Sequence, residues 1–507
     1  MSKSKYSILN AVSAMVMTLA NGFLGIVVTR YVITYFGSDF NGLNSTANQI
    51  VNMLLVLEGG FTLASNVALF APLSQGDYST VNSVLAATRA KFRRIGLLFL
   101  GIGSLIAIGY AFMVNSSFSF EFVTTLILMT IIPAAFNLFY ASTYRVLLQA
   151  QQKEFVVSLI TAATLALGHI SNIVMIKHGG PMWAVRMITM LFALFNSLLI
   201  ARYVKYKNRF VDCKQPPRPD LIKGTGAVMV QKITGVIYGA APIVFLSVLP
   251  SGGTMLASVY AVYNNIFQMV KTLLHAVIDA PRLSFGQLLT EKKREDVWDT
   301  FAQYEYAAFT AVFVMLTTCC ALIMPFIGLY TADVTDIDYY DTLIAVTMVL
   351  IATVEMIHLP CGHLINMAGR FQVAKNFQIT ACCVLIVSLS VGGWLFGVYG
   401  MLFALLLCAL LLATLEMGYV HLIFFEKKLW QLFRLLFPPI CVGTALCFVE
   451  MNLSIALNGY LSFILYGALF ATVNGICAVL VGLLFNRKTF LPLLRRVKNI
   501  LCRERME

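Results

Sequence analysis

Charged residues are scarce in this sequence. Of its 507 residues, 12% are charged and 59% are hydrophobic, whereas a soluble protein carries about twice that charged fraction. The scarcity excludes a soluble globular protein. Apolar runs of about 20 residues recur along the whole chain, and each is long enough to cross a hydrocarbon core of about 30 Å. The sequence therefore predicts an all-α integral membrane protein.

Motifs for catalysis and metal binding are absent as well. The sequence has no Walker motif, nucleophile elbow or HExxH motif, and no segment outside the apolar runs is large enough for a catalytic core. The 11 cysteines show no CxxC spacing and mostly lie within apolar runs, as Cys319 and Cys320 do. We interpret them as small buried hydrophobes. We expect no enzyme activity, no cofactor and no metal site.

The N-terminal segment is basic and then apolar, as a signal peptide is. Its apolar run continues to Phe36 without a small-residue cleavage site, so we interpret it as a retained first span. In total we predict about fourteen transmembrane helices. Their expected ranges are 8–36, 43–70, 95–114, 121–148, 155–176, 181–204, 226–249, 256–289, 301–330, 338–368, 378–396, 398–424, 435–451 and 460–485.

Positive charge is distributed unevenly between the two sides of this topology. Counted with residues just inside the helix ends, the segments on the side of the N-terminus hold 30 of the 36 lysines and arginines. The longest loop on the other side, "TADVTDIDYYD", is acidic. The positive-inside rule then places both termini in the cytoplasm. The net charge of +13 indicates this topology and contact with anionic membrane lipids, so we expect no nucleic-acid partner.

A weak internal repeat relates the two halves of the chain. With a shift of 216 residues, "NQIVNMLLVLEGGFTLA" (48–64) aligns with "NNIFQMVKTLLHAVIDA" (264–280), and the second span falls on the eighth. We therefore predict six-helix lobes at 1–205 and 224–424, around a central cavity, joined by a basic linker at 206–223. Two extra helices and a basic tail follow at 425–507. Repeated lobes around a central site are common in alternating-access transporters.

Polar residues line one face of each repeat-related helix. Lipid cannot satisfy such groups, so both faces should contact either a hydrated central cavity or hydrogen-bonding neighbours within the lobe. Lys271 favours the cavity, because it lies near the middle of its span and its side chain is too short to reach either surface. The residues concerned are Asn44, Asn48, Asn52, Glu58, Thr62 and Asn66 in the second span, and Asn264, Gln268, Lys271, His275, Asp279 and Arg282 in the eighth.

Other polar residues within the spans suggest structural roles. Arg145 and Arg186 lie near helix ends, where we expect them to reach the membrane surface as anchors. Asp279 and Arg282 either neutralise each other or face the cavity. We interpret the polar residues of the tenth span as an interior face with a kink at Pro360, since their spacing does not gather them as metal ligands. This face comprises Glu355, His358, Cys361, His363 and Asn366; His169, Asn172 and Glu416 are expected to be buried hydrogen-bonding groups.

Residues 30–96 resemble the first two spans and first cytoplasmic loop of Wzx-type polysaccharide flippases. These belong to the multidrug/oligosaccharidyl-lipid/polysaccharide exporter (MOP) superfamily. "YRVLLQAQQKEF" (144–155) is similar to the end of that family's fourth span. The matching features are Arg30, Gly37, Gly42-Leu43-Asn44, Glu58-Gly59, Ala64, Pro72-Leu73 and Phe92-Arg93-Arg94-Ile95-Gly96.

The resemblance implies a function and a location. It implies two six-helix bundles around a V-shaped cavity in the bacterial cytoplasmic membrane. The implied activity is to flip an oligosaccharide linked to undecaprenyl pyrophosphate to the outer leaflet, alongside a polysaccharide polymerase and glycosyltransferases. Arg30, Lys271 and Arg282 would donate to the pyrophosphate, and the asparagine and glutamine side chains to sugar hydroxyls. For Arg30, a position at the membrane surface is the alternative.

Two other functions stay open. A lipid II flippase has a similar anionic substrate, although it is expected to carry more basic residues in its first two spans. A cation-coupled drug antiporter is expected to carry an acidic residue in the first span, and residues 8–36 contain none.

Glu58 and Lys271 are expected at similar depth on the two lobes. We hypothesise that they pair across the cavity, so that a pyrophosphate competes for Lys271 and Glu58 takes up a proton or a sodium ion. The alternative is pairing within each lobe, for example of Lys271 with Asp279.

Overall fold

The computed structural model describes residues 3–503, except 59, 214, 223–225, 251, 292, 454 and 456–458. Gly59 and the linker residues Lys214 and Lys223 thus lie outside the described residues. Within the described ranges every regular element is helical, which confirms the all-α prediction.

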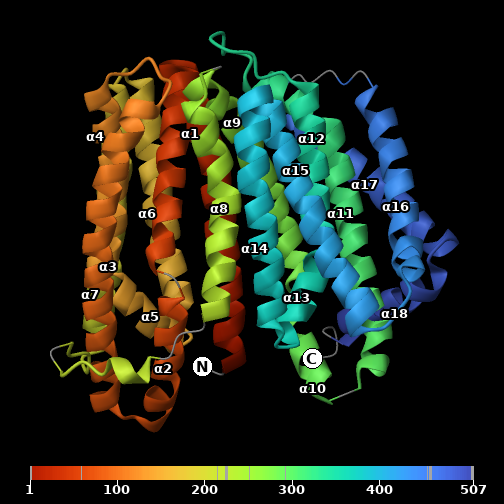
Figure 1. Ribbon diagram of the computed structural model, residues 1–507, viewed down its shortest axis with the longest axis horizontal. Coiled ribbons are helices and arrows are strands. Elements are labelled where there is room, and N and C mark those ends of the chain that lie inside the picture. The colour runs from red at the N-terminus through yellow and green to blue at the C-terminus, as the bar shows by residue number, and fades with distance from the viewer. Residues whose placement is uncertain are drawn as a thin grey trace. The chain divides into compact units, whose positions relative to one another are not determined.

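The helices of the first half are α1 (Lys3–Leu54), η1 (Leu55–Glu58), α2 (Phe61–Gln75), α3 (Tyr78–Met113), α4 (Phe120–Tyr140), α5 (Ser142–Ala150), α6 (Glu154–Lys177), α7 (Met182–Lys207), η2 (Pro219–Leu221), α8 (Gly226–Val248) and α9 (Gly253–Ile278). Those of the second half are α10 (Arg282–Glu291), α11 (Arg294–Tyr330), α12 (Thr342–Ile357), α13 (Leu359–Met367), α14 (Phe371–Ser388), η3 (Leu389–Gly393), α15 (Trp394–Gly418), η4 (Tyr419–Phe424), α16 (Leu429–Met451), α17 (Tyr460–Leu484) and α18 (Arg487–Arg503). Both series are shown in Figure 1.

Each of the fourteen expected spans corresponds to one helix or to consecutive helices. The described residues contain eleven helices that are long and apolar enough to cross a membrane. Two of these, Val12–Glu58 and Phe371–Phe424, cover more than one expected span each. The chain is therefore a multi-pass membrane protein. The predicted position of its termini in the cytoplasm stays a prediction.

Gly37 divides α1 into two arms. Its φ of 83° and ψ of 169° are not helical, and a residue with a side chain rarely adopts a positive φ. The chain turns back at this point, because both the N-terminus and α2 lie at the lower end in Figure 1. The first two expected spans are thus joined by a single glycine rather than by a longer loop.

Four expected spans are broken rather than continuous: the second, fourth, eighth and tenth. The fourth breaks at Ala141 and the tenth at His358. Pro360, at the start of α13, confirms the kink expected there. Between α9 and α10, Pro281 lacks the N–H that a continuous helix would need.

Backbone conformation repeats along the chain as the sequence does. Of the ten described residues with positive φ, six form three pairs, Gly37 with Gly253, Gln152 with Gly369, and Gly179 with Gly397, which are 216, 217 and 218 residues apart. The predicted shift is 216 residues. The two halves therefore share the same turns, as repeat-related bundles should.

Two compact units divide the chain at Val262/Tyr263, within α9. This division differs from the expected linker, because α8 packs against α1 in unit 1. The start of α9 is also bound there. Asn41 donates to Ser258 at 2.7 Å, and Thr254 donates to the carboxylate of Asp39. A large apolar core built from α1, α3, α4, α5, α6 and α7 holds unit 1 together.

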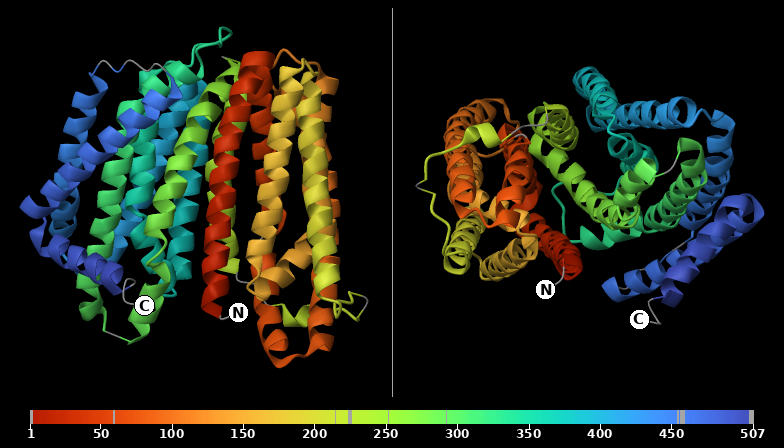
Figure 2. Two further views of the ribbon diagram at one scale, coloured as in Figure 1. Left: turned by 180° about the vertical axis from the view of Figure 1, so that it is seen from behind. Right: turned by 90° about the horizontal axis from the view of Figure 1, so that it is seen from below.

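In unit 2, α11 packs against α12, α16 and α17. Helix α18 runs crosswise to these helices, as both views in Figure 2 show. Its sequence, "RKTFLPLLRRVKNILCR", is basic and amphipathic, which is typical of a helix that lies in a membrane interface.

Candidate functional site

A polar cavity of about 600 Å³ lies inside unit 1. Its charged lining residues are Arg145, Arg186, Lys232 and Glu58, so three cations face one carboxylate. Side-chain amides and hydroxyls from several helices complete the polar part of the lining. They belong to Asn48, Thr62, Thr130, Asn137, Ser142, Gln149, Thr189 and Asn196.

Arg186 of α7 is the most buried of these cations, with 4% of its surface exposed. Its Nη1 donates to Asn48 Oδ1 at 3.0 Å, and its Nη2 donates to the backbone carbonyl of Asn44. Its Nε is buried and has no hydrogen-bond partner. The prediction that Arg186 is a surface anchor is therefore wrong. Its place near the start of α7 suggested an anchor, but the side chain points inward to α1.

The polar face of the second expected span, which continues from α1 into η1, contributes unevenly to this cavity. Asn48 and Glu58 line it, and Asn44 contacts it through Arg186. Glu58 accepts a hydrogen bond from Thr62. Two described residues that we predicted to line a cavity, Arg30 and Asn52, are not part of the lining of this one.

Two other polar residues of the first spans lie elsewhere. Asn52 is exposed and donates to Gln49 at 3.1 Å, and Arg30, on the first arm of α1, is half-buried. Arg145 carries a half-exposed side chain that forms an ion pair with Glu154 at 2.8 Å. Arg145 also lines the cavity, and its expected role as an anchor at the membrane surface stays a prediction.

The polar face of α9 has its own ion pair. Lys271 Nζ lies 2.9 Å from Glu355 Oε2 of α12, and the two side chains are 14% and 13% exposed. Glu355 belongs to the polar face predicted for the tenth span. Lys271 and Glu58 are thus each engaged within their own half of the chain, and their predicted pairing stays a prediction.

The remaining polar residues of this face follow one another along α9. Gln268 donates to Asn264 at 3.4 Å. Asp279 lies 3.5 Å from His275 and 3.3 Å from His363 Nε2. Arg282 is exposed, and its backbone N–H donates to the carbonyl of Asp279. The roles of these residues in substrate binding stay predictions.

A second group of buried polar residues lies in unit 2; sequence reasoning missed two of its members, Glu305 and His421, whereas the burial expected of Glu416 is confirmed. His421 Nε2 lies 3.0 Å from Glu305 Oε1, and Cys361 donates to the same oxygen at 3.4 Å. Nearby, His358 Nδ1 lies 2.8 Å from Glu416 Oε2. Because these residues come from four separate helical segments, no spacing in the sequence connects them.

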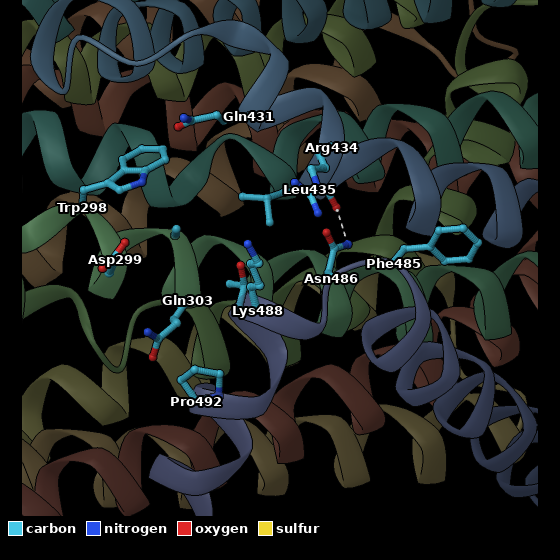
Figure 3. A pocket seen from close by; sticks show the side chains of 12 residues that line it. Trp298, Asp299, Gln303, Gln431, Arg434, Leu435, Phe485, Asn486, Lys488 and Pro492 are labelled. Carbon is cyan, nitrogen blue, oxygen red and sulfur yellow. Dashed lines mark hydrogen bonds between the residues drawn. The ribbon is translucent and has the colours of Figure 1, made fainter.

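A groove of about 440 Å³ opens between α11, α16 and the start of α18. Trp298, Gln303, Arg434 and Lys488 line it, as Figure 3 shows. Asn486, at its base, donates to the backbone carbonyl of Leu435 at 3.4 Å.

The side chains that line the unit 1 cavity are suited to a ligand that has both an anionic group and hydroxyl groups. A buried guanidinium can form charge-assisted hydrogen bonds with phosphate oxygens. The amides around it offer both donors and acceptors, as sugar hydroxyls require.

The sequence matches no protein-family model, and no curated protein matches it. Solved structures share its fold, however. A lipid II flippase MurJ in an inward closed conformation has a TM-score of 0.67 and 13% identity, over 91% of this chain and 98% of that chain. An inward-facing MATE-family multidrug resistance transporter of the MOP superfamily has a TM-score of 0.62 and 12% identity, over 85% and 98%.

A further structure with this fold is the Vibrio cholerae MATE transporter VcmN, solved as a mutant, with a TM-score of 0.53 and 13% identity over 82% and 98%. At these identities the likeness shows the fold. The chain therefore has the fold of MOP-superfamily transporters.

Proposed function

We propose that this protein is a transporter that moves an undecaprenyl-pyrophosphate-linked oligosaccharide across the bacterial cytoplasmic membrane, by alternating access and without enzymatic chemistry. The observation that carries the proposal is Arg186, a buried cation in a polar cavity with one unpartnered N–H. An arginine within a membrane span is energetically costly, and such residues therefore commonly mark a functional site.

The cavity lining supports an anionic substrate over a cationic one. Of the three cations that line the cavity, Arg145 is paired with Glu154. The other two, Arg186 and Lys232, exceed Glu58 by one positive charge, which would repel a cationic drug and attract a pyrophosphate. This favours a flippase over the drug transport named for the MATE neighbours, although all share one fold. Lys271 and Arg30 are proposed as further contacts of the pyrophosphate, while Asn48, Asn264 and Gln268 would bind sugar hydroxyls.

A lipid II flippase is the second candidate. The MurJ structure, with a TM-score of 0.67, favours it. Both candidates would bind the same kind of anionic lipid, so the described cavity alone does not distinguish their glycans.

Deletion of the gene in its own host distinguishes the candidates. A polysaccharide flippase predicts viable cells that lose surface polysaccharide and accumulate the lipid-linked oligosaccharide on the cytoplasmic side. Growth arrest with accumulated lipid II would instead indicate the second candidate. If neither lipid accumulates and only drug sensitivity rises, the proposal is overturned. Re-expression of the wild-type gene should restore surface polysaccharide, whereas an Arg186→Gln gene should not.

A further inference from the structure

We propose that Glu305, Cys361 and His421 form a binding site for a zinc ion within unit 2. The three side chains come from α11, α13 and η4. Each offers one ligand atom, and the three atoms lie within 4.8 Å of one another. Carboxylate oxygen, thiolate sulfur and imidazole nitrogen are the ligands that zinc uses in proteins.

The distances are close to those of a coordination sphere. Glu305 Oε1 lies 3.0 Å from His421 Nε2 and 3.4 Å from Cys361 Sγ. With metal–ligand bonds of about 2.0–2.3 Å, tetrahedral ligand atoms lie about 3.5 Å apart. Small side-chain movements therefore suffice to admit an ion, and the fourth position is left for a water molecule.

Burial supports a ligand at this position. Glu305 and His421 are both 0% exposed, yet Glu305 Oε2 and His421 Nδ1 have no hydrogen-bond partner. Buried polar atoms normally find partners. Glu305 Oε2 belongs to a proposed ligand group, so the hydrogen bonds present do not use the full capacity of this carboxylate, whereas His421 Nδ1 would face away from an ion bound at Nε2.

Charge balance points to a divalent ion. A glutamate carboxylate and a cysteine thiolate together carry two negative charges, and a neutral imidazole adds none. One Zn²⁺ therefore gives a neutral complex, which burial tolerates far better than an unpaired charge. On binding, the thiol proton and the proton shared between His421 and Glu305 leave for water, and no atom changes its oxidation state.

Aromatic rings surround the imidazole. The ring centroids of Trp298 and Phe301 lie 5.4 Å and 6.4 Å from that of His421. Trp298 also lines the groove of Figure 3, together with Asp299 and Gln303. The groove thus reaches Trp298, whose ring packs against the imidazole of His421. A bound ion would connect α11, α13 and η4.

Cobalt substitution tests the site directly, because Co²⁺ replaces Zn²⁺ and gives a visible and near-ultraviolet spectrum. The full-length protein, without a histidine tag, is produced in zinc-depleted medium with cobalt and purified in detergent. We expect about one cobalt per chain and a thiolate-to-cobalt charge-transfer band. Protein produced with zinc should hold about one zinc per chain.

Cys361→Ser should remove the charge-transfer band and lower the bound metal at least tenfold. Cys408→Ser is the matched control, since Cys408 is also buried but donates to the Ala381 carbonyl, and it should keep both. Zinc should raise the melting temperature of the wild type and of the control, but not that of Cys361→Ser.

Two results overturn the proposal. A band that survives in Cys361→Ser indicates adventitious metal at another cysteine. If the wild-type protein shows neither the charge-transfer band nor about one zinc per chain, the three residues bind no metal and are connected by hydrogen bonds alone. If Cys361→Ser does not fold, the spectrum and metal content of the wild type still decide between these outcomes.

Discussion

The Lys271 ammonium lies 2.9 Å from the Glu355 carboxylate, and both side chains are mostly buried. Each charge would be unfavourable alone in a membrane, so each depends on the other for its burial. A substrate that binds Lys271 must therefore compete with Glu355. The pair connects α9 to α12, and we propose that it couples folding and transport at one place.

Removal of one charge or of both should have different effects on stability. Lys271→Met leaves a buried carboxylate unpaired and should destabilise the protein by about 3–5 kcal/mol. Lys271→Met/Glu355→Met removes both charges and should recover most of that loss, yet fail to restore surface polysaccharide. Thermal unfolding in detergent and complementation of the deletion strain measure the two effects. Full complementation by the double variant would show that Lys271 serves structure alone.

An exposed ion pair provides the control for this experiment. Arg145 and Glu154 are 2.8 Å apart, with exposures of 52% and 25%. Because exposed pairs contribute about 0–1 kcal/mol, Arg145→Met/Glu154→Met should change the melting temperature little. If Arg145→Met/Glu154→Met lowered the melting temperature as much as Lys271→Met does, burial of the ion pair would not explain the effect of Lys271→Met.

The guanidinium of Arg186 should be required for transport. Arg186→Gln removes the charge and the unpartnered Nε–H, so we expect transport to fall at least tenfold. Arg186→Lys keeps the charge without the planar fork and should retain part of the activity. The measurement is surface polysaccharide at equal protein level. Arg202→Gln, an exposed arginine on the same helix, is the control and should behave as wild type; an unaffected Arg186→Gln would refute the proposed role.

Hydrophobic runs made the helices predictable, but they carry no information on what a polar side chain faces. The asparagines of the second span stood out because they repeat on one face, and Asn48 does line a cavity. Arg186 was misassigned because its distance from a helix end does not reveal the direction of its side chain. Glu305 and His421 were missed for a related reason. The two residues lie in different segments, 116 residues apart, and only tertiary packing brings them together.

Gly42 should tolerate no side chain. A Cβ at this position would overlap the backbone carbonyl of Thr254 and lie 3.1 Å from the Ser258 nitrogen. Gly42→Ala should therefore separate α1 from the start of α9 and lower the melting temperature, since backbone cannot move as a side chain does. Gly25→Ala is the matched control. It lies on the first arm of the same helix with nothing within 4 Å of its Cβ, and it should leave stability unchanged or slightly raised. Equal effects of the two substitutions would show that the close approach is not required.

Arg30 allows a test of charge against anchoring. It is half-buried on the first arm of α1, within an apolar stretch that contains no acidic residue between positions 8 and 36. If its charge acts on the pyrophosphate, Arg30→Lys should keep part of the surface polysaccharide, because an ammonium still attracts phosphate. Arg30→Gln should lose most of it at equal protein level. An interfacial anchor predicts a different order, since both polar side chains would hold the helix at the membrane surface. Polysaccharide display by Arg30→Gln at the wild-type level would therefore assign Arg30 to anchoring and leave Arg186 and Lys271 as the proposed cationic contacts of the substrate.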